Sequence, residues 1–444
     1  MRLQHLVVSL SIFVAATGIT TGRPIEFYPL ELIQPGQKGY AKTVFEGTNI
    51  ETFGVEILGV LRNTGPKRNI ILARLDGERI DRTGVFAGMS GSPVYLEGKL
   101  VGAIAYSFPF SKEPITGITP IEETVSIFQE APHIRSRMSQ VINPLQMYRI
   151  MESPGQLPYF NLQPWPTNNP FEKDNSLGKM QPIATPLNLS GSSPQSLRLF
   201  APALRTMGLE PIQALGNAKV EDYPNQPLEA GSTIAVQLIK GDMDLNATGT
   251  VTYISGEKIY AFGHPFLGIG YTDLPLSKAV VLTVIPSLST SQKLAAVTGS
   301  VGSIKQDRAS GILGVKGEIP KLIPVQLNLN TSRNRPKQFN FEIVTDSFLT
   351  PFLMAFTVHN SIVSSERVVG DQTLQIKTTI DIKGQPDVNF ENSISDLTNV
   401  PVLAAVAASS PVNFLLKSGF KDLLIENIEV EITAVEQTQE AVLE

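Results

Sequence analysis

Short runs in which hydrophobic and polar residues alternate recur along most of this chain, a pattern typical of β-strands with one buried and one wet face. The alternation is clearest from Leu374 to Ile382. In the first third of the chain the runs are separated by glycine turns, and Pro93–Leu96, Glu97-Gly98 and Leu100–Tyr106 together predict a β-hairpin. Strands of these lengths suit small closed β-barrels.

Helical patterns are few. The segments Ile121–Phe128 and Pro401–Ser409 predict short helices, and Ile428–Ile432 predicts a last strand. Eight prolines between residues 154 and 194 indicate an irregular linker or a surface insertion. We therefore expect a mainly β protein with two barrel-like parts at 23–135 and 228–320, a Pro-rich linker or insertion at 136–227, and an appended C-terminal β-rich domain with a short helix at 321–444.

The amino-acid composition and net charge exclude several classes of protein. Charged residues make up only 17% of the 444 residues, and 35 glycines and 32 prolines disfavour coiled coils and helical bundles. The net charge of −5, without a Lys/Arg-rich run, excludes the electrostatic footprint of a nucleic-acid binder or a polybasic membrane-surface protein. Cysteine is absent, which excludes disulfides, thiol nucleophiles and thiolate metal sites. With four scattered histidines besides, a transition-metal site is not expected.

The first 22 residues have the layout of a secretory signal peptide. Met1-Arg2 supplies a positive start, Leu6–Ala16 is largely apolar, and small residues follow at plausible cleavage positions. The apolar run is shorter than the ~20 residues of a membrane span, and no later segment is expected to reach that length. We therefore expect export to the periplasm or the extracellular space, with an uncleaved anchor as the alternative.

The segment Gly88-Met89-Ser90-Gly91-Ser92-Pro93 is the most informative motif. A serine between glycines in a tight turn has neighbouring backbone N–H groups that can point inward together. The N–H groups of Gly88 and Ser90 would then stabilise a tetrahedral oxyanion beside the Ser90 hydroxyl. Taken without its context, the same motif has an alternative interpretation as an ordinary Gly/Ser hairpin loop, in which Ser92 stabilises the turn.

Three blocks of the chain resemble the SpoIVB peptidase family, serine endopeptidases first associated with bacterial sporulation. The motif around Ser90 resembles the nucleophile segment of that family, and further similarity surrounds it. The blocks are Gly39–Gly47 with Phe53–Ile57, the stretch from Ile71 through Asp76 and Gly88–Pro93 to Ala103, and Gly256–His264, with Gly302–Ile304, Asp307-Arg308 and Gly311 as a further element.

The resemblance implies a serine endopeptidase that needs no cofactor and has a trypsin-like core of two β-barrels. Ser90 would be the nucleophile, His264 the general base and Asp76 the acidic member of the triad. The strand Thr116-Gly117-Ile118 resembles the edge along which an extended protein or peptide substrate would pair. In the family the histidine block precedes the serine block, whereas here it follows. The family's usual PDZ-type module is not evident, and the C-terminal β domain is a candidate substitute for it.

The other histidines and acids leave few rivals for these roles. His5 belongs to the expected signal peptide, His133 lies at the edge of the linker, and His359 fits a structural histidine. Asp81 and Asp273 remain alternatives to Asp76, because Asp76-Gly77 is also a strong turn signal. Two other functions stay open: a non-catalytic, peptidase-like envelope protein used for binding, and a protein that cleaves its own linker once.

Overall fold

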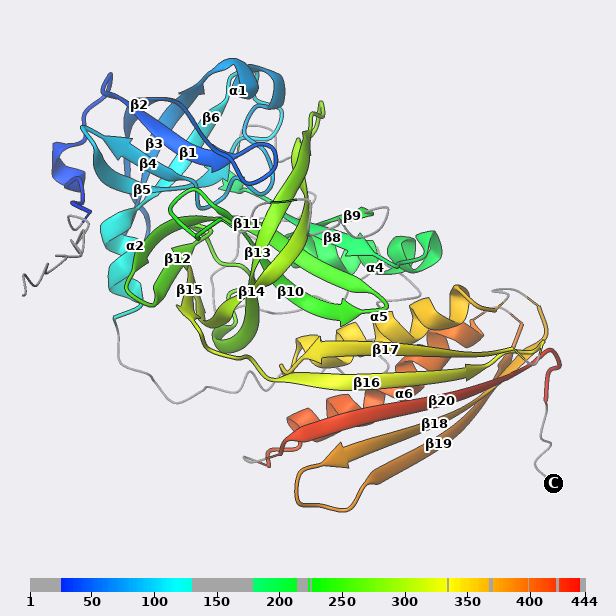
Figure 1. Cartoon of the computed structure of the whole chain (residues 1–444). Helices are drawn as coiled ribbons and strands as arrows, with labels where there is room; N and C mark the ends of the chain where they lie inside the picture. Colours follow the sequence, from blue (N-terminus) through cyan, green and yellow to red (C-terminus); the bar gives the residue numbers. More distant parts are fainter. Residues whose placement is uncertain are drawn as a thin grey trace, which may run out of the picture.

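The computed structural model describes residues 25–129, 179–213, 223, 226–333, 335–366, 370–397, 399–420 and 423–439. The expected signal peptide, His5, His133 and most of the expected linker lie outside these residues. The chain is mainly β, with 52% of its residues in strands and 18% in helices, which confirms the predicted fold class. Figure 1 shows two barrels beside an open sheet that carries helices.

The first barrel is a closed ring of six antiparallel strands in the order β4-β1-β2-β3-β6-β5, which the pairing of β4 with β5 completes. Its strands are β1 (Lys38–Val44), β2 (Ile50–Gly65), β3 (Arg68–Asp76), β4 (Pro93–Leu96), β5 (Lys99–Ser107) and β6 (Ile115–Pro120). Three short helices accompany it: η1 (Leu30–Leu32), α1 (Glu78–Thr83) and α2 (Ile121–Ile127). The alternating apolar residues of the strands fill its interior, where Ile57, Ile71 and Ile104 are fully buried. The hairpin β4–β5 and helix α2 were both predicted and are confirmed.

The second barrel is also a closed antiparallel ring, in the order β10-β13-β14-β15-β12-β11, completed by the pairing of β10 with β11. Its strands are β10 (Thr233–Gly241), β11 (Asp244–Ser255), β12 (Lys258–Ala261), β13 (Gly270–Ile285), β14 (Gln292–Arg308) and β15 (Gly311–Lys316). The segment before it begins with β7 (Gln181–Pro182), which pairs with β5, and continues through β8 (Thr185–Ser190), α4 (Pro194–Thr206) and β9 (Leu209–Gln213). The expectation of irregular structure is thus wrong for residues 181–213, because β8 pairs with β11 and α4 starts on a serine cap followed by proline.

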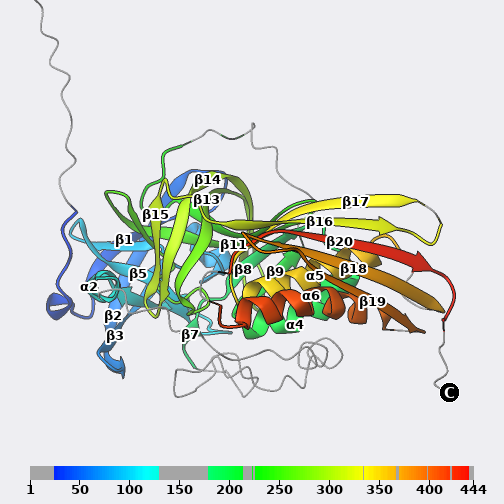
Figure 2. The same cartoon turned by 90° about the horizontal axis from the view of Figure 1, so that it is seen from below.

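An open sheet extends from the second barrel. Its strands are β16 (Leu322–Asn330), β17 (Pro336–Val344), β18 (Gln372–Ile382), β19 (Val388–Asp396) and β20 (Ile425–Val435). Two helices, α5 (Leu349–Val363) and α6 (Val400–Lys417), lie with α4 on one side of this sheet (Figures 1 and 2). β17 pairs with β10, so one sheet of 13 strands and one hydrophobic core join the second barrel to the C-terminal part.

Both helices of the C-terminal part differ from what the sequence predicts. Helix α6 is twice as long as the predicted segment, and α5 is not predicted at all, because all 15 of its residues are buried and it lacks a polar face. In length and hydropathy α6 reaches what a membrane span requires, contrary to expectation. Half of α6 is buried inside the fold, as in the core helix of a globular domain.

The long hairpin β13–β14 connects the two barrels. Near its tip, Gly47 and Val281 exchange two backbone hydrogen bonds of 2.7 and 2.9 Å. On the other arm, Ala87 donates to Ser291 O (2.8 Å) and accepts from Lys293 N (3.0 Å). Because Ala87 directly precedes Gly88, the second barrel positions the serine motif of the first.

Candidate active site at the contact between the barrels

The serine motif forms a turn that packs directly against the second barrel. Gly91 N donates to Ile104 O on β5 (2.8 Å), and Ser90 O accepts from Thr250 N on β11 (2.9 Å). Gly91 has φ +95°, and a Cβ on it would lie 2.0 Å from Thr250 O, so only glycine fits. The close approach of the barrels therefore depends on Gly91.

The side chains of the two motif serines are used differently. Ser92 Oγ donates to Met89 O (2.6 Å) and stabilises the turn, as predicted. Ser90 is completely buried, and its Oγ has no hydrogen-bond partner among the described residues. The N–H groups of Gly88 and Ser90 likewise donate to no acceptor in the described part of the chain. A hydroxyl and two backbone donors are thus left unused in one turn.

His264 follows β12 on an unusual stretch of backbone. Phe262 and Gly263 have φ of +71° and +70°, and Phe262 is a fully buried, non-glycine residue in this region. A Cβ on Gly263 would lie 2.8 Å from Ala103 Cβ on β5, and Gly263 O accepts from Thr119 Oγ1 (2.6 Å). The backbone before His264 is therefore held against the wall of the first barrel.

The hydrogen bond of Nδ1 sets the tautomer of His264. Nδ1 lies 2.7 Å from Pro265 O, and because a carbonyl only accepts, Nδ1 carries the proton and Nε2 the lone pair. Nε2 is buried without a partner among the described residues. Burial lowers the pKa of His264 to about 4, although the carbonyls of Pro265 and Ile183 act in the opposite direction. At neutral pH His264 is thus an uncharged base with its lone pair free.

Ser90 and His264 do not form a hydrogen bond with each other. They nevertheless belong to the same contact between the barrels, since a Cβ on Gly91 would lie 2.6 Å from Phe262 N. Each side of this contact therefore contributes one buried, unpaired polar atom of complementary chemistry, Ser90 Oγ and His264 Nε2.

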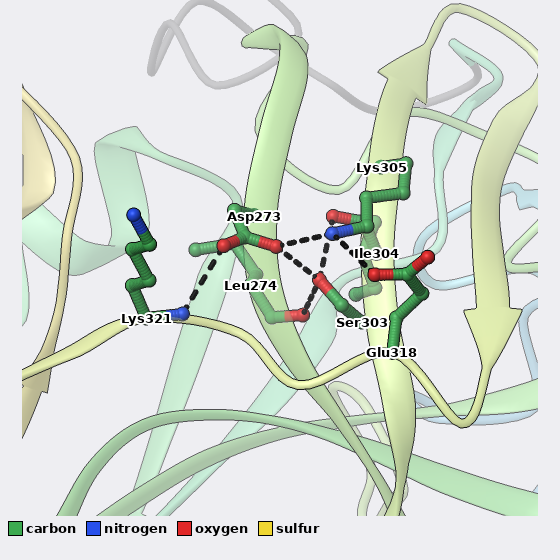
Figure 3. A network of polar contacts seen from close by, with 7 residues as sticks. All are labelled: Asp273, Leu274, Ser303, Ile304, Lys305, Glu318 and Lys321. Atoms are coloured by element: carbon green, nitrogen blue, oxygen red, sulfur yellow. Dashed lines mark hydrogen bonds and ion pairs between the residues drawn. The ribbon is translucent and has the colours of Figure 1, made fainter.

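Neither Asp76 nor its two rivals contacts His264. Asp76 is exposed at the end of β3, where it pairs with Gly54, and Asp81 is exposed on α1. Asp273 belongs to a separate network (Figure 3), in which its carboxylate accepts from Ser303 Oγ (2.6 Å), Lys305 Nζ (2.7 Å) and the backbone N–H of Lys321 (3.1 Å). Burial tends to raise the pKa of Asp273, but these donors hold it below its usual range.

The carboxylate that is coupled to His264 is Asp307, which the sequence did not single out for this role. Asp307 lies on β14, is 1% exposed, and accepts from Phe266 N (2.8 Å), Leu267 N (2.7 Å) and Ile269 N (3.3 Å). It therefore holds the loop that contains Pro265. Burial raises the pKa of Asp307 to about 6, with the loop N–H groups acting to lower it. The Asp307-Arg308 block was the only sequence signal for this residue.

Residues 20–121 match the model of the SpoIVB peptidase S55 family. The match confirms the resemblance for the segment that carries the first barrel, Asp76 and Ser90, and it ends before His264. No curated protein and no solved structure matches the chain. Within the described ranges, no three His, Cys, Asp or Glu side chains gather in a way that could hold a metal ion.

A buried lysine beside the serine turn is the second residue of this region that the sequence did not single out. Lys293 is fully buried on β14, and its Nζ donates to the hydroxyls of Thr43 (3.1 Å) in the first barrel and Thr250 (3.2 Å) and Thr233 (3.4 Å) in the second. Burial lowers its pKa to about 7. Thr250 Oγ1 also donates to Gly88 O (3.0 Å), so the amine supports the serine turn through Thr250.

The predicted substrate edge is not available in this fold. Thr116, Gly117 and Ile118 lie on β6, which pairs with β3 on one side and with β5 on the other. An interior strand has no free N–H and C=O groups, so that prediction is wrong. A cavity of about 610 Å³ between the barrels, bordered by Val44 and Thr233, does not reach Ser90 or His264. Ser90 and His264 are 0% and 2% exposed, so both side chains are enclosed.

Proposed function

We propose that this protein is an exported serine endopeptidase that cleaves protein or peptide substrates with Ser90 as nucleophile and His264 as general base. One observation carries the proposal: Ser90 Oγ and His264 Nε2 are both buried and unpaired on facing sides of one contact, beside two unused backbone N–H groups. Other buried side-chain atoms of the described residues also lack a partner, among them Tyr271 OH and Thr378 Oγ1. What distinguishes Ser90 and His264 is that a hydroxyl and an unprotonated ring nitrogen belong to one contact, and a reaction that needs both atoms free explains why they are unpaired.

The chemistry follows from the atoms at the site. His264 Nε2 takes the proton of the Ser90 hydroxyl while Oγ attacks the scissile carbonyl, and the N–H groups of Gly88 and Ser90 stabilise the oxyanion. The imidazolium then gives its proton to the leaving amine, and a water molecule repeats the sequence on the acyl-enzyme. The step requires Oγ and Nε2 to approach to ~2.6–3.2 Å, closer than in the structure, where the two atoms form no hydrogen bond.

In this proposal Asp307 takes the place of the carboxylate in a triad. Pro265 O accepts from His264 Nδ1, and the same peptide group donates its N–H, that of Phe266, to Asp307. The negative carboxylate polarises the peptide group and so stabilises the imidazolium that forms during the reaction. Asp307 touches neither substrate nor Ser90 and is a positioning residue. Asp76, exposed and without a bond to His264, has no part in the step.

A serine-directed fluorophosphonate tests the proposal on the purified protein. Wild type should be labelled at Ser90, slowly because the site is enclosed, and Ser90→Ala and His264→Gln should not be labelled. Ser196→Ala and His359→Gln are the matched controls, because this other buried serine and histidine, on α4 and α5, pair with each other at 2.9 Å. These controls should keep their label if folded.

The opposite result would also be informative. If the folded wild type stays unlabelled, and a folded variant with a less crowded His264, Ile183→Gly, stays unlabelled too, the serine is not activated. The non-catalytic binding protein would then be the better interpretation, and partners of the C-terminal sheet should be sought.

A further inference from the structure

A segment of the chain itself crosses the candidate active site. Strand β7 (Gln181–Pro182) pairs antiparallel with β5, with Gln181 opposite Ser107 and Pro182 opposite Tyr106. The next residue, Ile183, donates its N–H to Ala105 O (2.9 Å). The segment then enters β8 and the second barrel. It therefore pairs with the first barrel through β7 and with the second barrel through β8.

This segment continues the edge of β5 to which the serine turn is bonded. Ile104 on β5 accepts from Gly91 N (2.8 Å) and donates to Ser92 O (2.9 Å), and the adjacent residue Ala105 accepts from Ile183. The register of β5 against β6 shifts between Ile104 and Tyr106, which is how two successive residues face the same edge. A peptide on Ala105–Ser107 thus starts where the nucleophile turn ends.

The segment also covers the groups that the reaction uses. Ile183 is 3% exposed, belongs to the hydrophobic core of the first barrel, and places its carbonyl by the ring of His264. Three residues further on, Pro186 Cγ lies 3.0 Å from where a Cβ on Gly88 would be. Between these two points the chain passes the general base and one oxyanion donor. An extended peptide bound along the same edge would lie beside the same two groups.

We propose that the β5 edge at Ala105–Ser107 is the substrate-binding strand of the peptidase, and that residues 179–186 occupy it as an intramolecular competitor. This inference rests on the proposed function. It also defines the class of substrate: an extended peptide that pairs with β5 through its backbone and buries an aliphatic side chain at the position of Ile183. Backbone pairing supplies affinity and the aliphatic pocket supplies selectivity.

A tethered competitor explains why the site is enclosed. A segment of the same chain acts at an effective concentration of about millimolar, so a free peptide of similar affinity displaces it only at comparable concentrations. Binding of a better substrate or of a partner that removes the segment would expose Ser90 and His264. The uncut chain is then expected to be a slow peptidase.

A reversible lock tests the inference by labelling. The chain has no cysteine, so the double variant Ser107→Cys/Gln181→Cys contains its only two thiols, at positions that are direct partners across β5 and β7. Oxidation should abolish fluorophosphonate labelling of Ser90, and reduction should restore it. The control lock Thr379→Cys/Asn389→Cys joins partners on β18 and β19 and should leave labelling unchanged. Labelling at equal rates in the oxidised and reduced forms would overturn the inference.

A binding measurement separates this inference from the proposed function, because it needs no catalysis. The probe is a fluorescent peptide, KMQPIAT, that copies residues 179–185, and the protein carries Ser90→Ala. Anisotropy should show that the peptide binds about tenfold or more tightly when Ile183→Gly weakens the chain's own copy. A peptide with Asp in place of Ile should not bind, and Ile212→Gly, at a buried isoleucine on β9, should not enhance binding.

The outcomes are distinct. If the peptide binds but no variant is labelled by the fluorophosphonate, the β5 edge remains a peptide-binding site and the proposed peptidase activity is overturned. The intramolecular competitor is overturned, and the peptidase proposal kept, by either of two results. One is labelling that does not change when the Ser107→Cys/Gln181→Cys lock closes, and the other is a peptide that binds equally well with and without Ile183→Gly.

Discussion

The carboxylate of Asp307 and the imidazole of His264 bind opposite ends of the same peptide group. His264 Nδ1 donates to the carbonyl of Pro265 at 2.7 Å, and the N–H that follows that carbonyl donates to Asp307 at 2.8 Å. In a Ser-His-Asp triad the acid binds Nδ1 directly and fixes the tautomer. Here a backbone carbonyl fixes the tautomer, and the acid holds that carbonyl in place.

The Asp307→Asn substitution should slow the labelling of Ser90. Asparagine has nearly the same shape but carries no charge, so the peptide group is less polarised and the imidazolium is less stabilised. We expect about a tenfold lower rate, which corresponds to ~1.4 kcal/mol in activation free energy. Because burial raises the pKa of Asp307 to about 6, labelling by wild type should decline as pH falls through 6, and this decline should be absent in the variant.

The matched control for that experiment is Asp76→Asn. Asp76 is exposed on the first barrel and forms no bond with His264. Its labelling rate should equal that of wild type. A strong loss in Asp76→Asn with none in Asp307→Asn would reverse the assignment of the acid.

Replacing Gly91 by alanine should destabilise the protein severely. The new Cβ would lie 2.0 Å from Thr250 O and 2.6 Å from Phe262 N, so the barrels would have to separate. Gly98→Ala is the control, because Gly98 also has positive φ (+78°) but open space around it. Urea unfolding should show that Gly98→Ala lowers the free energy of unfolding by about 1 kcal/mol, from backbone strain alone, and that Gly91→Ala lowers it by several times that amount. Equal losses would mean that the barrels adapt to the clash.

The buried lysine predicts a rise in stability with alkaline pH. Lys293 has a pKa of about 7 in the folded chain and 10.5 as a free group, so between these values only the unfolded state holds the proton. The free energy of unfolding should therefore increase with pH from about 7 to 10.5, by at most ~1.4 kcal/mol per pH unit. Lys293→Met should remove this increase and be at least as stable as wild type at pH 7. If the free energy of unfolding of wild type does not rise relative to that of Lys293→Met as pH increases, the amine stays charged in the folded chain.

The histidines predict a loss of stability in mild acid. Burial lowers the pKa values of His264 and His359 to about 4, below the ordinary value of 6.5. The unfolded chain therefore binds more protons between pH 6.5 and 4, and stability falls across this window as pH decreases. Urea unfolding at several pH values should show that His264→Gln and His359→Gln each remove part of the slope. An unchanged slope in both variants would assign acid sensitivity to other groups.

The sequence predicted the parts of the site that depend on local chemistry. The turn around Ser90 needs glycines at fixed offsets, and the β4–β5 hairpin has a clear turn signal, so both could be read from the sequence. Asp307 was missed because its partners are backbone N–H groups some forty residues earlier. Lys293 was missed because nothing in its neighbourhood marks a lysine for burial. Strand β7 was missed because it lies in a proline-rich stretch and exists only by pairing with β5.

The pairing of β17 with β10, with Ile239 opposite Ile343, makes the C-terminal sheet continuous with the second barrel, which carries His264. Cutting the chain near residue 320 would remove β17, the partner of the end of β10, and would expose the shared hydrophobic core to which α5 and α6 contribute. Such a fragment would present an unprotected strand edge, which is prone to aggregate. The two barrels are therefore not expected to be separable as a minimal domain, and a ligand that binds the outer sheet would act on β10, the strand that carries Thr233.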